Sequence, residues 1–420
     1  MMTDASDVLV IGGGAAGMMA ALFAARSGAQ VTLAEKNEKL GKKVYITGKG
    51  RCNVTNACQD AEEFLREVPR NPRFLYSALG LLMPQDLLSL LRELGCETKI
   101  ERGRRAFPVS DHASDVTKAL EKGLRAAGVR ILLHTEIRRV AAENGAAIGA
   151  EAADGRFLAA RRVIVCTGGL SYPATGSTGD GFRWAGETGH RIAAPQPSLS
   201  GLVTAEKWPA ELQGLTLKNV CLSARSCGKM IYSEMGEMLF THFGVSGPLA
   251  IECSAHLPES GRAEIAVDLK PGLTQEQVDA RLVRELAAGG KKQLSSVLQS
   301  MLPQRFAALF PALCGLSGQT ACSQVTAPMR AALAGAFKAL PLTVCGLRPI
   351  EEAIVTRGGV DVRDVRPGTM ESKRLPGLYF AGEVLDVDAH TGGYNLHIAW
   401  CTGALAGKSA AESALGGEEA

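Results

Sequence analysis

The sequence predicts an α/β protein with a Rossmann-like sheet, interrupted by an inserted β-barrel-like domain and an inserted helical domain. Three observations predict this fold class. An apolar run from Val8 leads into a glycine-rich turn and then into helix-forming residues. Two later apolar runs end in Gly168-Gly169 and in Gly382-Glu383. Between them, near Pro195, the composition changes to short β-rich runs and then to helical runs.

The glycine-rich turn has the G-x-G-x-x-G spacing, with Gly12, Gly14 and Gly17 at its three glycine positions. Gly12 allows a sharp turn, Gly14 lets a pyrophosphate approach the backbone, and Gly17 lets the helix pack closely on the strand. The helix then begins at Ala15 and Ala16, where free N–H groups and the positive end of the helix dipole favour phosphate. The turn therefore predicts a dinucleotide site.

An acidic residue supports this interpretation. The second apolar strand, residues 30–34, ends in Glu35, whose carboxylate can accept hydrogen bonds from a ribose diol. Strand, turn, helix and acid together favour dinucleotide binding over a glycine-rich turn without a ligand. No second G-x-G-x-x-G follows a strand, so transient nicotinamide binding and the use of O₂ both stay open.

The bulk composition is that of a globular protein. The chain has 420 residues, of which 46% are hydrophobic and 21% charged, and a net charge of +3. We therefore expect several domains and no nucleic-acid or membrane partner. The 11 cysteines include no Cys-x-x-Cys pair, and no His, Cys or carboxylate cluster has zinc spacing. We expect a cytoplasmic protein with reduced thiols and no metal.

The pattern of runs also predicts the domain boundaries. A Rossmann-like domain is expected over residues 1–194 and 342–420. A β-rich insert on the substrate side is expected over residues 195–272, since short runs there have the spacing of a small antiparallel sheet or barrel. A helical insert is expected over residues 273–341, where a capping box at Thr274 precedes a helical apolar period.

Several loops are too long and too polar to be mere connections. Residues 36–56 are glycine-rich and basic, and Arg51, Asn53 and Asn56 offer hydrogen-bond donors. Residues 171–181 are rich in glycine and hydroxyl groups. The basic segment 99–105 could hold a phosphate or a carboxylate, but a solvated basic turn is the better interpretation.

These motifs together resemble the HI0933-like (YhiN/BaiN, or aminoacetone oxidase) family of FAD-dependent oxidoreductases, among the flavoproteins with two dinucleotide-binding domains. The resemblance spans nearly the whole chain and is carried by residues 12–17, 41–43, 47–56, 166–169, Pro173, 176–181, 240–248, 356–360, 381–388 and 391–395. Two positions depart from the family pattern. Lys49 stands where a glycine is common, and Ala389-His390 replaces a glycine and a variable residue. Both lie in loops expected near the flavin, where they would affect the choice of substrate.

The resemblance implies FAD as cofactor and a small molecule as substrate. It implies a cofactor site made of Gly12, Gly14, Ala15, Ala16, Gly17, Glu35, Lys36, Lys43, Gly50, Arg51, Cys52, Asn53, Thr167, Gly168, Gly382, Glu383, Gly393, Tyr394 and Asn395. The last three would place a helix N-terminus under the pyrimidine edge of the flavin. Reduced flavin is negative near N1 and the C2 carbonyl, so a helix dipole there would stabilise it.

Three side chains are candidates for catalysis, each with a plainer alternative. Cys52 lies in a basic loop that would favour a thiolate, although a packing thiol beside the flavin is the better interpretation. His390 could donate a proton to substrate, as could His397 less plausibly, or both could be structural. Tyr394 could donate a proton or simply stack.

The function expected from the resemblance is hydride transfer through flavin N5. The favoured form is NAD(P)H-dependent reduction of an activated C=C bond in a bile-acid or steroid-like enone. The first alternative is oxidation of a small amine such as aminoacetone, which yields H₂O₂. Alternatives of other classes are a flavin-containing RNA-binding or RNA-modifying protein, with residues 99–105 as its basic footprint, and a redox-responsive binding protein in which FAD is structural.

Overall fold

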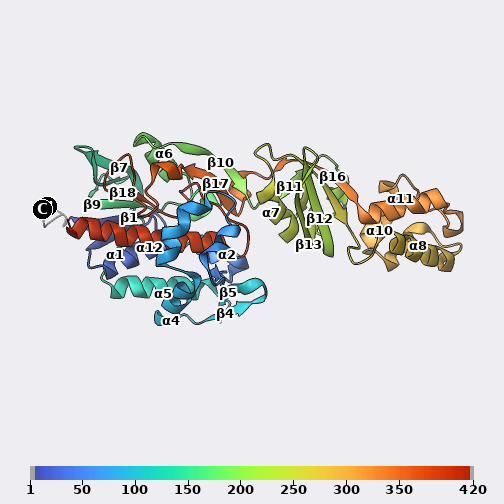
Figure 1. Cartoon of the computed structure of the whole chain (residues 1–420), viewed down its shortest axis with the longest axis horizontal. Helices are drawn as coiled ribbons and strands as arrows, with labels where there is room; N and C mark the ends of the chain where they lie inside the picture. Colours follow the sequence, from blue (N-terminus) through green and yellow to red (C-terminus); the bar gives the residue numbers. More distant parts are fainter. Residues whose placement is uncertain (1–4, 417–420) are drawn as a thin grey trace. The chain divides into compact units, whose positions relative to one another are not determined.

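The computed structural model describes residues 5–416 and divides them into two compact units. Among these residues, the first unit comprises 5–198 together with 349–416, and the second comprises 199–348 (Figure 1). These boundaries lie a few residues beyond the predicted ones at 194 and 342. The chain thus leaves the first unit once, forms the second, and returns.

The first unit is built on a mainly parallel sheet with the strand order β6-β2-β1-β9-β8-β7, in which β18 also pairs with β9. Its strands are β1 (Ser6–Ile11), β2 (Val31–Ala34), β6 (Arg130–Leu132), β7 (Ile137–Glu143), β8 (Ala146–Ala152), β9 (Phe157–Val165) and β18 (Leu378–Phe380). The central strand β1 is parallel to both neighbours, with Leu9 opposite Thr32 and Val163. Buried valine and leucine side chains fill these central strands, as a sheet covered on both faces requires.

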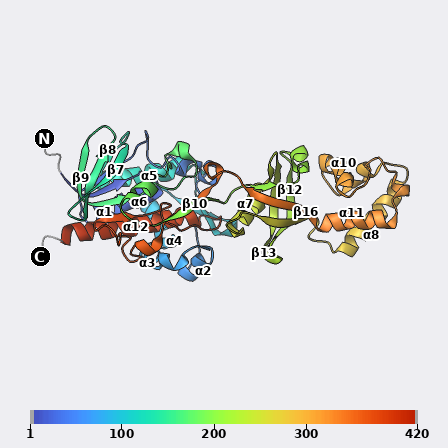
Figure 2. The ribbon, with the colours of Figure 1, turned by 90° about the horizontal axis from the view of Figure 1, so that it is seen from above.

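Two helices lie side by side along this sheet, α1 (Ala15–Arg26) and α12 (Tyr394–Leu415) (Figures 1 and 2). Their backbones approach closely because α12 carries glycines one turn apart. A Cβ on Gly403 would lie 2.3 Å from the carbonyl oxygen of Ala16, and one on Gly407 would lie 2.1 Å from that of Ala20. The C-terminal helix therefore fixes the start of α1, where the glycine-rich turn ends.

The remaining elements of the first unit surround the sheet. They are α2 (Ala61–Arg66), α3 (Tyr76–Leu81), α4 (Pro84–Glu93), α5 (Ala113–Ala126), α6 (Asp180–Glu187), β3 (Thr55–Asn56), β4 (Thr98–Glu101), β5 (Arg105–Pro108), β10 (Ile192–Ser198) and β17 (Val355–Val360). A small sheet has the order β3-β5-β4, and β10 pairs with β17. Short 3-10 turns join several of them.

One segment, Pro72–Glu93, is long and apolar enough by composition to cross a membrane, although half of it is buried. In the structure it is not one continuous α-helix. It contains the 3-10 turn Pro72–Leu75, then α3 and α4, and the chain is extended at Met83 between these two helices. Leu87, Leu90 and Leu91 of α4 are buried. Packing in the core accounts for their apolar character.

The second unit contains a closed barrel with the strand order β11-β14-β13-β12-β15-β16. Its elements are β11 (Leu202–Thr204), β12 (Thr216–Ser226), β13 (Lys229–Thr241), β14 (Gly244–Ser246), α7 (Gly247–His256), β15 (Ala263–Asp268), α8 (Gln275–Gly289), α9 (Leu294–Val297), α10 (Gln304–Leu313), α11 (Ala327–Lys338) and β16 (Leu340–Leu347). Barrel and helices share one hydrophobic core, in which Phe240 of β13 packs edge-on against Phe306 of α10. The β-rich and helical inserts thus form one compact unit.

Some local expectations were wrong. The loop 36–56 contains a 3-10 turn, Val44–Gly50, and the short strand β3. The apolar run that ends in Gly168-Gly169 is part of a longer strand, β9, which already begins at Phe157. Strand β8 and helix α7 were not predicted, because alanine and glycine dominate the first and the second follows the short strand β14 directly.

Candidate functional site

The turn between β1 and α1 depends on two glycines. Gly12 has φ +100°, and a Cβ there would lie 2.5 Å from the carbonyl oxygen of Cys166 on the neighbouring strand end. A Cβ on Gly17 would lie 1.8 Å from the carbonyl oxygen of Gly12. No side chain fits at either position. The glycine-rich turn is therefore required for strand and helix to pack.

Gly14 is different. It precedes the first residue of α1 with φ −75°, which any residue can adopt. Among the described residues, no atom lies within 4 Å of the position a Cβ would occupy. Ala15 and Ala16 follow as the first residues of the helix. The helix N-terminus therefore opens onto free space, as the approach of a pyrophosphate requires.

Glu35 follows β2 and is buried, with its carboxylate held by three donors. The backbone N–H of Gly13 donates to Oε2 at 2.6 Å, while the backbone N–H and side-chain Nδ2 of Asn37 donate to Oε1 at 2.7 and 2.6 Å. These bonds fix the carboxylate beside the glycine-rich turn and leave lone pairs for a ribose diol. Asn37 was not predicted, since its role follows only from the turn after Glu35.

Lys36 reaches a different part of the chain. Its Nζ donates to Thr178 Oγ1 at 2.6 Å and to Asp180 Oδ2 at 2.9 Å. The predicted loop 171–181 is thereby tied to the end of β2. The lysine positions this loop, and its predicted contact with cofactor stays a prediction.

Four buried side-chain oxygens lack partners among the described residues: Asn53 Oδ1, Thr167 Oγ1, Thr241 Oγ1 and Asp388 Oδ1. The first two belong to the predicted cofactor set, and Thr167 follows the strand end that Gly12 contacts. Gly168, with φ +72°, comes next and lets the chain turn there. A buried oxygen without a partner is costly, so bound polar groups would satisfy both. The orphaned atoms, together with the open helix N-terminus, fit a bound dinucleotide.

Glu383 is the centre of a polar network that joins four segments. Lys43 Nζ donates to its two oxygens at 3.0 and 2.8 Å, Ser171 Oγ donates to Oε1 at 3.1 Å, and the backbone N–H of Thr356 donates to Oε1 at 3.0 Å. Lys43 and these hydrogen bonds lower the pKa of Glu383 although burial opposes them. Ser171 and Thr356 were not predicted as site residues, but both lie in or beside the motifs quoted above.

The beginning of α12 closes the same region. Gly393, with φ +105°, precedes the helix, and a Cβ there would lie 2.5 Å from the backbone carbon of Thr55. Asn395 Oδ1 accepts from the Ala389 N–H at 2.8 Å, and its Nδ2 donates to the carbonyl oxygen of Ala389 at 2.6 Å. A Cβ on Gly382 would lie 2.8 Å from the Cβ of Ala16. The ends of β18, α1 and α12 therefore meet where the prediction placed the cofactor.

Arg51 contacts the segment 101–111, which lies outside its own loop. Its Nε donates to Asp111 Oδ1 at 2.9 Å, a further ion pair joins it to Glu101, and its guanidinium lies 4.1 Å from the centre of the Phe107 ring. Gly50 precedes it with φ +85°. These contacts give the arginine a structural role that the sequence did not predict, and its place beside the flavin stays a prediction.

The expectation of a thiolate at Cys52 was wrong. The side chain is fully buried, and its backbone has φ +59°. Burial raises the pKa of the thiol to about 12, against a smaller lowering by a hydrogen bond with Thr47. A neutral, inaccessible thiol does not act as a nucleophile. The plainer interpretation, a thiol that packs in the loop, agrees with this environment.

Cys52→Ser should therefore keep FAD and most of the activity, because a buried, neutral thiol takes no part in the chemistry. In the native protein, alkylation at pH 8 should modify the exposed Cys227 and Cys345 and leave Cys52 unmodified, as peptide mass spectrometry can show. Modification of Cys52 as fast as Cys227 would contradict the account. Complete loss of activity in a Cys52→Ser protein that still holds FAD would do the same.

The two remaining catalytic candidates differ in environment. Tyr394 is buried, and its ring packs edge-on against Phe64 with 5.1 Å between centroids. Burial raises the pKa of this tyrosine, so its phenol keeps its proton at neutral pH. His390 is half-buried, and its backbone N–H donates to the carbonyl oxygen of Glu67 at 2.9 Å. Both side chains lie at the start of α12, and proton donation by either stays a prediction.

His397 is a core residue. Its Nε2 donates to the carbonyl oxygen of Leu82 at 3.0 Å, so its Nδ1 accepts from the Thr55 hydroxyl at 3.0 Å. Burial lowers the pKa of the imidazole to about 4. At neutral pH the ring therefore carries one proton, on Nε2, and this N–H is hydrogen-bonded to the carbonyl oxygen of Leu82. The alternative that His397 donates a proton to substrate is wrong.

This histidine should make the protein acid-sensitive. Its pKa rises from about 4 in the folded state to 6.5 on unfolding, so below pH 6.5 the unfolded chain binds a proton that the folded chain does not. The free energy of unfolding should fall by about 2 kcal/mol between pH 7 and pH 5 through this group alone. Urea unfolding of the wild type and of His397→Gln at both pH values measures it. Equal losses in the two proteins would contradict the assignment.

Comparison with known proteins gives relatives along the whole chain. It is 34% identical to the 3-dehydro-bile acid delta(4,6)-reductase of Clostridium scindens, over 96% of this chain and 98% of that protein. It is 31% identical to the ribosomal RNA dihydrouridine synthase of Haemophilus influenzae, over 95% and 97%. The 3-ketosteroid delta1-dehydrogenase of Sterolibacterium denitrificans has a similar fold, with a TM-score of 0.51 and 16% identity over 98% of this chain and 100% of that one.

The family model described as the HI0933-like protein Rossmann domain matches residues 6–409, which include both parts of the first unit and all of the second. The glycine-rich turn, the carboxylate of Glu35 and the orphaned oxygens of Asn53 and Thr167 lie within this match and fit FAD. The flavoprotein resemblance of the sequence is confirmed. The chain belongs to the HI0933-like family and is an FAD-dependent oxidoreductase.

Proposed function

We propose that this oxidoreductase reduces a C=C bond conjugated to a carbonyl group in a small, steroid-like molecule, with NAD(P)H as electron donor. The observation that carries the proposal is the 34% identity, over almost the full length of both chains, to a protein named as a bile-acid delta(4,6)-reductase. Because the similarity covers 96% of this chain and 98% of that protein, it supports the same type of reaction in both.

Reduction of such a bond needs a hydride at the β-carbon and a proton at the α-carbon. FAD, when bound, supplies the hydride chemistry. The chain must hold the cofactor, orient the substrate and keep a proton ready. Tyr394 is one candidate for this role, because its phenol is protonated at neutral pH, although the raised pKa that burial gives it makes it a weaker acid. His390, four residues earlier in the loop before α12, is the alternative donor.

A second candidate substrate is uridine in RNA, which the relative named as a ribosomal RNA dihydrouridine synthase favours. The C5=C6 bond of uracil is conjugated to a carbonyl, so the same chemistry would serve both substrates. The basic segment 99–105 offers less charge to RNA than its sequence indicates. Lys99 pairs with Asp111 and Arg104 pairs with Glu63. We therefore place the small enone first.

The test uses the flavin-loaded enzyme in separate reactions. A steroid-like enone and a uridine-containing RNA are each offered as acceptor with NADH or NADPH and without oxygen, and aminoacetone is offered as donor in air without nicotinamide. The proposal predicts that the enone gains two hydrogen atoms, as mass spectrometry detects. Reduction of the RNA alone would transfer the proposal to the second candidate. Oxidation of aminoacetone in air with release of H₂O₂, and no enone reduction, would overturn it.

A further inference from the structure

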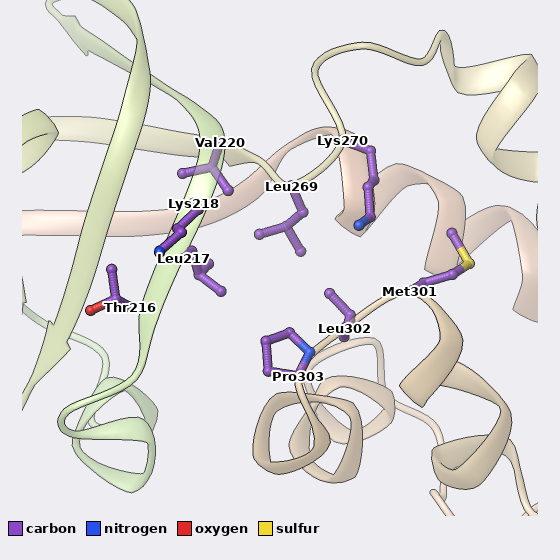
Figure 3. A pocket seen from close by; sticks show the side chains of 9 residues that line it. All are labelled: Thr216, Leu217, Lys218, Val220, Leu269, Lys270, Met301, Leu302 and Pro303. Carbon is purple, nitrogen blue, oxygen red and sulfur yellow. The ribbon is translucent and has the colours of Figure 1, made fainter.

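The second unit contains a pocket that lies within that unit alone. Its volume is about 260 Å³, and it is lined by residues of β12, of the segment after β15 and of the segment before α10. The lining residues are Thr216, Leu217, Lys218, Val220, Leu269, Lys270, Met301, Leu302 and Pro303 (Figure 3). The family match and the FAD site leave this pocket without a role.

The wall of the pocket is mostly aliphatic. Figure 3 shows Leu217, Leu269 and Leu302 grouped around one gap, with the ammonium end of Lys270 turned toward them. In the same view the ammonium of Lys218 points to the far side of β12. Lys270 is therefore the cation that faces the apolar residues. The pocket offers one positive charge at the edge of an apolar wall.

Lys270 lacks a counterion. Among the described residues its Nζ has no hydrogen-bond or ion-pair partner, and only its backbone atoms are bonded. The acid two residues before it, Asp268, already pairs with Lys338 at 2.6 Å. Burial, and then the positive charge of Arg281, lower the pKa of Lys270. A partly desolvated ammonium beside a second cation is stabilised by any anion that reaches it.

We propose that this pocket binds an aliphatic carboxylate of medium chain length, with the carboxylate on Lys270 and the chain against Leu217, Leu269 and Leu302. At about 30 Å³ for each water-sized group, the volume of 260 Å³ has room for about nine such groups, which suits an acid of about eight carbons. The ammonium of Lys270 favours a carboxylate over an amine or an alcohol of the same length. This site is independent of the FAD site and of the proposed reaction.

The experiment is isothermal titration of the full-length, flavin-loaded protein with octanoate. Acetate and 1-octanol are the ligand controls, since the first lacks the chain and the second lacks the charge. Octanoate should bind, and acetate should not. Octanol should bind at least about tenfold more weakly than octanoate, because it has no charge-assisted hydrogen bond. No binding of octanoate at millimolar concentration would overturn the proposal.

Two lysine variants form a matched pair. Lys270→Met keeps the aliphatic stem and removes the charge that faces the pocket, while Lys218→Met removes a neighbouring charge that points away. Octanoate affinity should fall about tenfold or more in Lys270→Met and stay within about twofold of wild type in Lys218→Met. Equal losses in both, or none in either, would overturn the role of Lys270. Unchanged melting temperatures establish that both variants are folded.

Discussion

Gly14→Val should give a folded protein that holds no FAD. No described atom lies within 4 Å of the position of the new Cβ, and the backbone at φ −75° accepts any residue. The valine side chain would instead occupy the space in front of the helix N-terminus, where we expect the pyrophosphate to bind. We expect FAD affinity to fall more than about 100-fold, equivalent to about 3 kcal/mol. Flavin absorbance and circular dichroism of the purified protein measure the two outcomes.

Gly17→Val is the matched control. Its Cβ would lie 1.8 Å from the carbonyl oxygen of Gly12, so strand and helix could not pack. This variant should lose the fold as well as the flavin. A yellow Gly14→Val protein with normal FAD affinity would show that the pyrophosphate does not approach this turn.

Lys43→Met should reduce the free energy of unfolding by about 3 kcal/mol. The change leaves the carboxylate of Glu383 with Ser171 and the Thr356 N–H but removes Lys43, its ion-pair partner among the described residues. Removing one member of a largely buried ion pair costs several kcal/mol because the other charge stays uncompensated. Urea unfolding of the flavin-free protein measures this loss without the contribution of bound cofactor.

The double variant Lys43→Met/Glu383→Gln tests the cause. Glutamine removes the charge that Lys43 compensates, so the double variant should be more stable than Lys43→Met alone. If the loss of stability in the double variant equalled the sum of the losses in Lys43→Met and Glu383→Gln, the two side chains would not interact energetically. That result would also remove the basis for regarding this network as the link between the four segments.

Sequence reasoning identified the parts of the site whose geometry is local. Gly12, Gly14, Gly17 and Glu35 lie within one βαβ unit, so spacing along the chain fixes how they meet in space. The partners of Glu383 could not be found in this way. Lys43 lies 340 residues away along the chain, and only the folded sheet brings the two together.

Composition misled where burial decided the chemistry. Basic and glycine residues around Cys52 indicated a thiolate, but the chain folds its side chain into the core, where charge is unfavourable. Arg51, its neighbour, uses its charge on Glu101 and Asp111. The strands and helices of the second unit were recognised from the spacing of their apolar residues along the chain. Their common core, in which Phe240 packs against Phe306, depends on contacts between distant residues, which this spacing does not show.

The reduction of a conjugated C=C bond is tested most directly without the natural electron donor. The enzyme-bound FAD is reduced photochemically without oxygen and then mixed with a steroid-like enone in a stopped-flow spectrometer. The account predicts that the absorbance of oxidised flavin returns rapidly, with one enone reduced for each flavin. Reduced flavin that stays bleached with the enone, and is reoxidised only when oxygen is admitted, would contradict the account.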